Sequence, residues 1–165
     1  MGVGAMARAR LPLDSILPDT YPEELRARGW ELHRTGRFAH FAVFPGRGYQ
    51  AFHWLVLYGK SGARHGGQEK LEWTERALEF AFEVGAALGD APVAVAGDFN
   101  LEPEESDSVA RALATGAWRD LAAEHGSAAT CFAPGAAPSR IDAVFANRAA
   151  AAAVTGIRVV EDCPW

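Results

Sequence analysis

The stretch Val93-Ala-Val-Ala-Gly-Asp-Phe-Asn100 decides how this sequence is organised. Pro92-Val-Ala-Val-Ala96 is a short continuous apolar run, which is typical of a central strand buried on both faces. The run passes into Gly97 and then into two polar residues, Asp98 and Asn100, whose side chains have the same parity. Because loop residues that follow a strand project into the crevice where ligands bind, Asp98 and Asn100 can face one ligand.

Asp98 and Asn100 supply two chemical groups that suit a phosphate ester. A carboxylate can bind a hard cation or hold a water molecule for attack. A carboxamide can donate hydrogen bonds to a phosphoryl oxygen as charge builds on it in the transition state. The same tetrapeptide also fits a plain turn in which Asp and Asn bond only the backbone. Both interpretations are open on these four residues alone.

A second polar cluster opens a later strand. Ser139-Arg140-Ile141-Asp142 precedes an apolar pattern, and Arg140 and Asp142 are expected on one face of that strand. Burying Asp142 beside Val144 costs free energy unless a cationic or hydrogen-bonding group accompanies it. Two interpretations follow, namely an Arg–Asp contact at a strand edge, or an aspartate that orients a histidine base.

Strands and helices are predicted around both motifs. The apolar patterns indicate strands over 38–44, 52–58, 92–96, 140–146 and 156–160, helices over 68–88 and 104–114, and mostly irregular chain over 117–139. The first two strands flank the turn signal Pro45-Gly-Arg-Gly48, so they are expected to form an antiparallel hairpin. Prolines break the first stretch, where one short helix is predicted near Tyr21. The order of elements predicts a mixed α/β layout with helices covering a sheet.

Two histidines fall on the predicted hairpin. None of the five histidines has the spacing of metal ligands, so His40 and His53 are interpreted as packed or edge residues. On the second strand, His53 shares a face with Leu55 and Leu57, whereas the face of Trp54 includes Tyr58.

The composition is that of one globular domain. The chain has 165 residues, of which 49% are hydrophobic and 22% charged, which argues against disorder. Its two cysteines, Cys131 and Cys163, argue against a disulfide scaffold and favour free thiols in a reducing, intracellular compartment. No apolar run approaches the roughly 20 residues that span a bilayer, so no membrane association is expected.

The charge is unevenly distributed. A net charge of −5 disfavours non-specific wrapping of nucleic acid. Residues 1–70 contain ten Lys and Arg against six Asp and Glu, whereas residues 71–165 contain six against fifteen. The acidic second half is either an ordinary solvated surface or includes carboxylates that surround a divalent cation.

Taken together and in this order, the two motifs resemble those of the endonuclease/exonuclease/phosphatase superfamily, which includes the deoxyribonuclease I-like enzymes. In that superfamily a G-D-[FL]-N motif ends a central strand and an R-[IL]-D motif begins a later one. The matching residues here are Gly97-Asp98-Phe99-Asn100 and Arg140-Ile141-Asp142. Leu57-Tyr58-Gly59 resembles the position of the family's active-site tyrosine, and the resemblance covers about residues 37–162.

The resemblance implies a partial two-sheet β-sandwich flanked by helices, which is the deoxyribonuclease I-like fold in truncated form. It also implies a hydrolase of phosphodiesters or phosphomonoesters, nuclease-like in type, that uses Mg²⁺ or Mn²⁺. By the family's pattern, Asp98 positions the attacking water and binds the metal together with Asn100. Tyr58, Asn100 and Arg140 contact the substrate phosphate, and Asp142 orients a catalytic histidine. A phosphate ester, above all a nucleic acid, is the partner that this implies.

The sequence departs from the family's pattern at both ends. Residues 1–36 contain no asparagine, and the glutamates there lie in helical or loop-like context, so the family's metal-binding glutamate has no counterpart. No histidine follows His125, so the general base is missing too. We therefore expect a poorly defined N-terminal segment over 1–36 and a partial domain over 37–165, with weak or no activity. The alternative is a non-catalytic remnant, either a binding module or a gene fragment.

Overall fold

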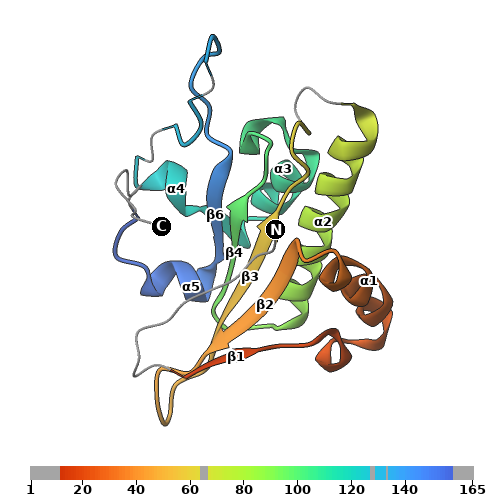
Figure 1. The fold of residues 1–165 in the computed structure, drawn as a ribbon. Helices are drawn as coiled ribbons and strands as arrows, with labels where there is room; N and C mark the ends of the chain where they lie inside the picture. Colours follow the sequence, from red (N-terminus) through yellow and green to blue (C-terminus); the bar gives the residue numbers. More distant parts are fainter. Residues whose placement is uncertain (1–11, 64–66, 127–128, 133, 158–165) are drawn as a thin grey trace.

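Six strands, five α-helices and two short 3-10 helices form the described part of the chain (Figure 1). The structure is a computed structural model, and it describes residues 12–63, 67–126, 129–132 and 134–157. In chain order the elements are β1 (Leu13–Ser15), η1 (Pro18–Thr20), α1 (Glu23–Arg34), β2 (Phe38–Val43), β3 (Phe52–Tyr58), α2 (Gln68–Ala87), β4 (Val93–Asp98), η2 (Pro103–Glu105), α3 (Asp107–Ala114), β5 (Trp118–Asp120), α4 (Leu121–Glu124), β6 (Asp142–Asn147) and α5 (Arg148–Ala153).

All six strands belong to one mixed sheet with the order β1-β2-β3-β4-β6-β5. β2 and β3 form the predicted antiparallel hairpin, and β4 runs parallel to β3 after the crossover through α2. β6 is antiparallel to β4, so its first residues lie at the edge of the sheet where β3 and β4 end. This topology brings the ends of three segments that are distant in sequence to one edge of the sheet.

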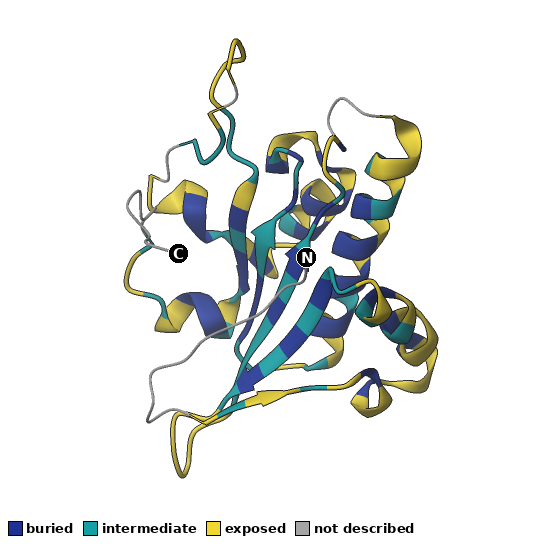
Figure 2. Ribbon diagram, viewed as in Figure 1, coloured by how far each residue is buried: buried dark blue, intermediate teal, exposed yellow. Residues whose placement is uncertain are grey.

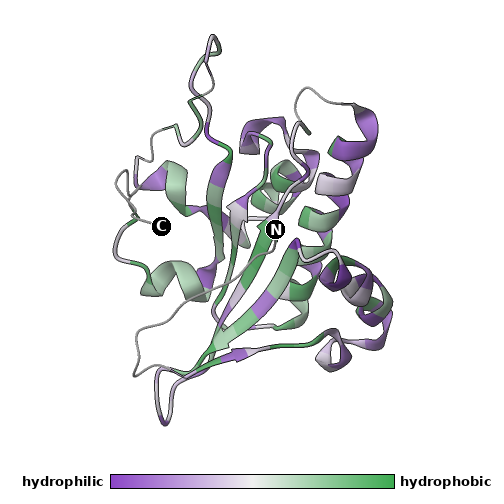
Figure 3. Ribbon diagram, in the orientation of Figure 1, coloured by the Kyte–Doolittle hydropathy of each residue, from purple (hydrophilic) through white to green (hydrophobic). Residues whose placement is uncertain are grey.

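One face of the sheet carries the main hydrophobic core, beneath α1, α2 and α3 (Figure 1). Leu55 and Leu57 on β3 and Val93 and Val95 on β4 are at most 1% exposed, and they pack with Leu78 of α2. Figure 2 shows buried and half-buried residues alternating along β2, as the two-residue period of a strand requires. Figure 3 shows hydrophobic residues along β3 and β4 and hydrophilic ones on α1.

The opposite face carries a second, smaller cluster. Leu121 of α4 and Ala150 of α5 are buried with Ala146, and Phe52 and Val144 pack against them. The mixed α/β class, a sheet flanked by helices, is therefore confirmed. Among the described residues there is one sheet only, so the second sheet of the implied sandwich is not formed by this part of the chain.

The stretch over 117–139 is more ordered than expected. Trp118–Asp120 form β5, which pairs with the end of β6, and α4 follows at once. Asp120 both ends β5 and caps α4, because its side chain accepts a hydrogen bond from the N–H of Ala123 at 3.0 Å. A strand of three residues shows no measurable alternation, which is why the hydrophobic pattern did not reveal it.

Two other predicted boundaries shift. The helix expected over 104–114 begins at Asp107, because the side chain of Ser106 accepts a hydrogen bond from the Val109 N–H at 3.2 Å and caps it there. Its first expected turn is the separate 3-10 helix η2. Most of the strand predicted over 156–160 lies outside the described residues.

The segment before residue 37 contributes defined elements. β1 pairs with β2, and α1 packs against α2, although the sequence predicted only a short helix there. The division of the chain at residue 37 remains a prediction. In the described residues no helix is long and apolar enough to cross a membrane. Cys131 carries a free thiol, and Cys163 lies outside the described residues.

Candidate active site

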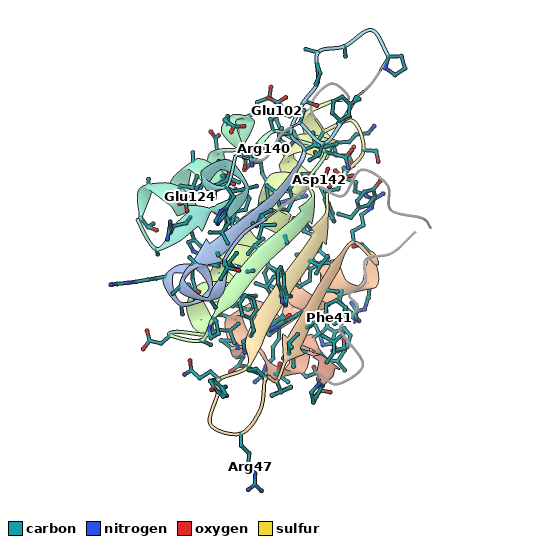
Figure 4. The ribbon with its side chains drawn as sticks, turned by 90° about the vertical axis from the view of Figure 1, so that its left-hand side faces the viewer. Phe41, Arg47, Glu102, Glu124, Arg140 and Asp142 are labelled. Atoms are coloured by element: carbon teal, nitrogen blue, oxygen red, sulfur yellow. The ribbon has the colours of Figure 1, made fainter. Side chains whose placement is uncertain are left out.

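Three polar side chains form a row across the sheet. Tyr58 on β3 is in register with Asp98 on β4, and Asp98 is in register with Asp142 on β6. Residues in register on neighbouring strands point to the same face, so all three share the face that α2 does not cover. Figure 4 shows Asp142 near Arg140 at one end of the sheet and Arg47 at the far end. The structure therefore brings together three of the residues that the sequence singled out.

Asp98 and Asp142 form a close pair of like charges. The N–H of Phe99 donates to the carbonyl oxygen of Ile141 at 2.8 Å. This bond lies beside the aspartate pair, which makes it a non-hydrogen-bonded pair, the kind whose side chains lie closest. Burial raises the pKa of Asp98; the hydrogen bond from the Asn100 N–H opposes this effect, and the negative charge of Asp142 adds to it. A bound cation would relieve both unfavourable effects.

Backbone contacts hold the turn that follows β4. Oδ1 of Asp98 accepts a hydrogen bond from the Asn100 N–H at 2.9 Å, and Nδ2 of Asn100 donates to the Gly59 carbonyl oxygen at 3.3 Å. Asn100 has φ 51°, in the left-handed region that asparagine tolerates. The turn in which Asp98 and Asn100 bond the backbone is thus formed. It leaves Oδ2 of Asp98 without a hydrogen-bond partner among the described residues, so the same turn can also bind a ligand.

Two glycines allow β3 and β4 to approach at this edge. A Cβ on Gly59 would lie 2.0 Å from the carbonyl oxygen of Phe99, and one on Gly97 would lie 1.8 Å from that of Leu57. Gly97 also has φ +151°. Because no side chain fits at either position, the register that sets Tyr58 beside Asp98 requires glycine at both.

Arg37 adds a positive charge next to Tyr58. Its guanidinium carbon lies 4.8 Å from the centroid of the Tyr58 ring, and Nη1 donates to the Gly59 carbonyl oxygen at 2.8 Å. The cation–π contact orients the tyrosine ring and places a cation at the edge of the row. The contact of Arg37 with Tyr58 was not predictable from the sequence, because only the register of the hairpin brings the start of β2 to the end of β3.

Arg140 is bound by two acidic side chains. Its guanidinium donates to both oxygens of Asp120, at 3.2 and 2.8 Å, and to Oε1 of Glu104 at 2.8 Å. The side chains of Arg140 and Asp120 are each 11% exposed. Arg140 lies outside the strand that was expected to begin with it, since β6 begins only at Asp142. The Arg–Asp contact does form, but with Asp120, and it joins β5 and η2 to the residue before β6. The substrate contact expected of Arg140 remains a prediction.

Asp142 is exposed, and its carboxylate makes no hydrogen bond to a histidine in the described ranges. Its position is set by the main chain, because its N–H and that of Ile141 both donate to Oγ1 of Thr130, at 3.1 and 3.2 Å. In this part of the chain Asp142 therefore has no histidine to orient as a catalytic base.

The fit of a metal ion to this site is partial. The described residues contain no group of three or more His, Cys, Asp and Glu side chains placed to bind a metal ion. The glutamates of the first 36 residues, Glu23, Glu24 and Glu31, are all on α1, on the other side of the sheet. Mg²⁺ is commonly bound by one or two carboxylates and several waters. The carboxylates of Asp98 and Asp142 match that minimal set.

The sequence profile of the Endonuclease/Exonuclease/phosphatase family matches residues 7–163. The chain belongs to this family. Comparison with curated proteins by sequence gave no match.

Solved structures share the fold of this family member. SmcL aligns with a TM-score of 0.52 and 16% identity, over 69% of this chain and 44% of SmcL. A β-hairpin deletion mutant of beta toxin from Staphylococcus aureus aligns with a TM-score of 0.52 and 14% identity, over 79% and 51% of the two chains. D. rerio TDP2 in complex with a single-strand DNA product aligns with a TM-score of 0.50 and 14% identity, over 84% of this chain and 54% of TDP2. The chain thus spans about half the length of these three proteins.

Glu104 is the second acidic partner of Arg140, and this contact was not predicted from the sequence. It lies on η2, four residues after Asn100, within the acidic run Glu102-Pro-Glu-Glu105. An acidic run of this kind usually indicates a solvated surface. Only the structure shows that one of its carboxylates reaches Arg140 and so links the two family motifs.

Proposed function

We propose that this member of the endonuclease/exonuclease/phosphatase family binds a divalent cation at Asp98 and Asp142 and hydrolyses phosphate esters there. The row of Tyr58, Asp98 and Asp142 at one edge of the sheet is the observation that carries the proposal. Two carboxylates in one non-hydrogen-bonded pair repel each other, and burial raises the pKa of Asp98. Such an uncompensated acidic pair, next to a tyrosine and an arginine, suits a metal-bound phosphate.

Each side chain of the row has a distinct part in this proposal. Asp98 keeps Oδ1 on the Asn100 N–H, which sets the direction of Oδ2 and leaves that oxygen to accept a hydrogen bond from the attacking water. The Tyr58 hydroxyl would donate to a phosphate oxygen, and Arg37 would add positive charge beside it. Asn100 completes the site through its side-chain oxygen.

Asp98, Asp142 and Asn100 are the residues that would hold Mg²⁺ or Mn²⁺. When bound, such an ion neutralises phosphate charge and stabilises the leaving oxygen. The chain itself contributes the position of the carboxylates, which two separate hydrogen-bond systems fix: the Asn100 N–H for Asp98 and Thr130 for the backbone of Asp142.

We expect the turnover of this chain to be low. The described residues supply two carboxylates and no histidine hydrogen-bonded to Asp142, so a general base is lacking there. Loss of one member of a catalytic unit usually removes most of the rate. The alternative function is a non-catalytic binding module. An intracellular location, expected from the cysteine content, stays a prediction.

Nucleic acid is the substrate class that we favour. The TDP2 structure with the same fold holds a single-strand DNA product, which supports a phosphodiester over other phosphate esters. Arg37 at the edge of the row offers a contact for a second phosphate along such a strand.

Metal dependence tests the proposal directly. The full chain is titrated with Mn²⁺ while its melting temperature and its hydrolysis of bis(4-nitrophenyl) phosphate are measured. We expect Mn²⁺ to raise the melting temperature and to support weak hydrolysis. Asp98→Asn should abolish both effects, and Asp142→Asn should weaken both. Asp14→Asn, an exposed aspartate on β1 at the other side of the sheet, is the matched control and should behave as the unmodified chain.

The outcomes separate the candidate functions. Metal binding at Asp98 without any hydrolysis favours the binding module. No effect of Mn²⁺ on stability rules out the metal site and with it the proposed chemistry. Rapid turnover by the full chain would show that it contains ligands and a base beyond the row described above.

A further inference from the structure

A cavity of about 600 Å³ lies at the end of the sheet opposite to Asp98. It is bounded by η1, α1, the hairpin and the last turn of α2, and its residues include Arg26, His53 and Leu88. His53 pairs with Val93 at the start of β3 and β4, five residues before Tyr58. At about 3.3 Å per residue along the strand, His53 lies roughly 16 Å from the row of Tyr58, Asp98 and Asp142. The cavity is therefore a separate site.

A chain of hydrogen bonds runs from the core to this cavity. The hydroxyl of Tyr21 lies 3.1 Å from Nδ1 of His40, and Nε2 of His40 lies 2.9 Å from Nδ1 of His53. All three side chains line the cavity, and Tyr21 and His40 are 4% and 2% exposed, whereas His53 is half-buried. The proposed hydrolysis makes no use of these three side chains.

The direction of the hydrogen bonds follows from Tyr21. In the described part of the chain its hydroxyl has no hydrogen-bond partner other than His40, and a buried hydroxyl donor left unpaired costs free energy. Tyr21 therefore donates to Nδ1 of His40, so that Nε2 of His40 carries the proton and donates to His53. Nδ1 of His53 is then the acceptor, and its own proton is on Nε2.

The imidazoles of His40 and His53 are both uncharged at neutral pH. Burial, as the larger cause, and the neighbouring His53 together lower the pKa of His40 to about 3. Burial also lowers the pKa of His53. Nε2 of His53 is thus a neutral N–H donor toward the cavity, and the hydrogen bond from His40 to Nδ1 fixes the orientation of the His53 ring.

Arg26 supplies the only charge among the described residues that line the cavity. Its Nε donates to the Tyr21 carbonyl oxygen at 2.9 Å, which anchors the side chain and leaves the terminal nitrogens without a partner in the described ranges. Val84 of α2 and Leu88, which directly follows α2, form an apolar wall. A fixed N–H donor, an anchored cation and an apolar wall define the ligand chemistry.

We propose that this cavity binds a small organic anion, with its anionic group at Arg26 and Nε2 of His53 and its apolar body against α2. The geometry excludes a metal ion as the intended ligand, because Nδ1 of His53 and Nε2 of His40 are bonded to each other. A neutral ligand of the same shape would lack the attraction of Arg26. The proposal is independent of the proposed hydrolysis.

The test uses the full chain and three probes of one shape: 2-naphthoate, 2-naphthyl phosphate and the neutral 2-naphthylmethanol. Calorimetry gives the affinities, and nitrogen NMR of the histidine rings reports the tautomer and the shift of His53. We expect saturable 1:1 binding of the anions, at least tenfold tighter than that of the alcohol, with His53 in the Nε2–H form. The tighter of the two anions identifies the head group.

Two variants of surface residues locate the binding. Arg26→Gln should weaken binding of the anions at least tenfold and leave the alcohol unchanged, and Ala87→Phe should block all three by filling the cavity. Arg47→Gln, at the tip of the β2–β3 hairpin (Figure 4), is the control and should bind as the unmodified chain. Unchanged melting temperatures confirm folding of the variants. The proposal is overturned by absence of saturable anion binding, by full affinity in Arg26→Gln, or by His53 in the Nδ1–H form.

Discussion

Asp98 at the end of β4 and Asp142 at the start of β6 are direct partners across two antiparallel strands, with Tyr58 next in the same row. The hydrogen bond from Phe99 to Ile141 places this pair at a position where facing side chains are closest. Two carboxylates placed face to face cost free energy, because like charges directly opposite destabilise a sheet. The pair therefore represents a cost in stability that a bound cation would remove.

Asp98→Asn is expected to stabilise the cation-free protein. The substitution keeps Oδ1 as acceptor for the Asn100 N–H and removes the repulsion from Asp142. Like-charge pairs of this type cost about 0.5 kcal/mol, so the free energy of unfolding in EDTA should rise by about that amount. Urea denaturation measures it, with Asp14→Asn as control. A loss of stability in Asp98→Asn would mean that the charge itself is needed for folding.

Arg140→Gln is expected to lower the free energy of unfolding by about 2–4 kcal/mol, because it removes the cationic partner of the mostly buried Asp120 carboxylate. Arg140→Lys should recover only part of this loss, since an ammonium group cannot bind both Asp120 oxygens as the planar guanidinium does. Urea denaturation is again the measurement. The control is Arg119→Gln, which breaks the exposed pair with Glu124 and should leave the denaturation midpoint where it was.

Acid should destabilise the protein through His40. Its pKa is about 3 in the folded state against an ordinary value of 6.5, so the unfolded chain binds the proton more strongly. The stability due to the neutral imidazole is complete above pH 6.5 and is lost as the pH falls toward 3, at roughly 1 kcal/mol per pH unit. His53, whose pKa is also lowered, adds to the upper part of this range.

The slope of unfolding free energy against pH, taken from urea titrations between pH 7 and 4.5, is the quantity to measure. His40→Gln should flatten it, whatever its effect on stability at pH 7. His125→Gln, at the exposed end of α4, should keep the slope of the unmodified chain. Equal slopes in all three proteins would assign the acid sensitivity to other groups.

Gly59→Ala is expected to cost about 3 kcal/mol or more, because its Cβ would meet backbone atoms of Phe99 that cannot rotate away. To make room for this Cβ the ends of β3 and β4 must move apart, which should separate Tyr58 from Asp98 and lower the affinity for Mn²⁺. Gly156→Ala adds a Cβ in open space and should change stability by less than about 0.5 kcal/mol. Thermal unfolding with and without Mn²⁺ gives both quantities, and a stable, metal-binding Gly59→Ala protein would contradict the close-approach argument.

Much of the sheet and part of the site were predictable. The hairpin and α2 appear close to their expected positions, because each has a clear hydrophobic period, and β4 does so because its short apolar run is continuous. β5 and α4 were missed, since three- and four-residue elements depend on pairing with β6 and on the Asp120 cap. The motif Gly97-Asp98-Phe99-Asn100 predicted a candidate site at the end of β4, because polar residues that follow a buried strand project into the crevice beside it.

The partners within the site were not predictable. Arg37 and Glu104 carry no local signal that separates them from ordinary surface charges, and each acquires its role from a contact with a residue distant in sequence, Tyr58 and Arg140 respectively. The same holds for His40 and His53. Their packed positions were expected, but the hydrogen bond between them depends on the register of β2 against β3.

The local sequence was enough to predict which strands are buried, where the central strand ends in Asp98, and which family the two motifs resemble. These properties depend on hydrophobic period and on side chains adjacent along the chain. The folded chain was needed to show which carboxylates face each other, that Arg140 binds Asp120 instead of Asp142, and that two hydrogen-bonded histidines line a cavity. These contacts follow from strand register and crossover, because packing of the whole core sets the neighbours of a polar side chain.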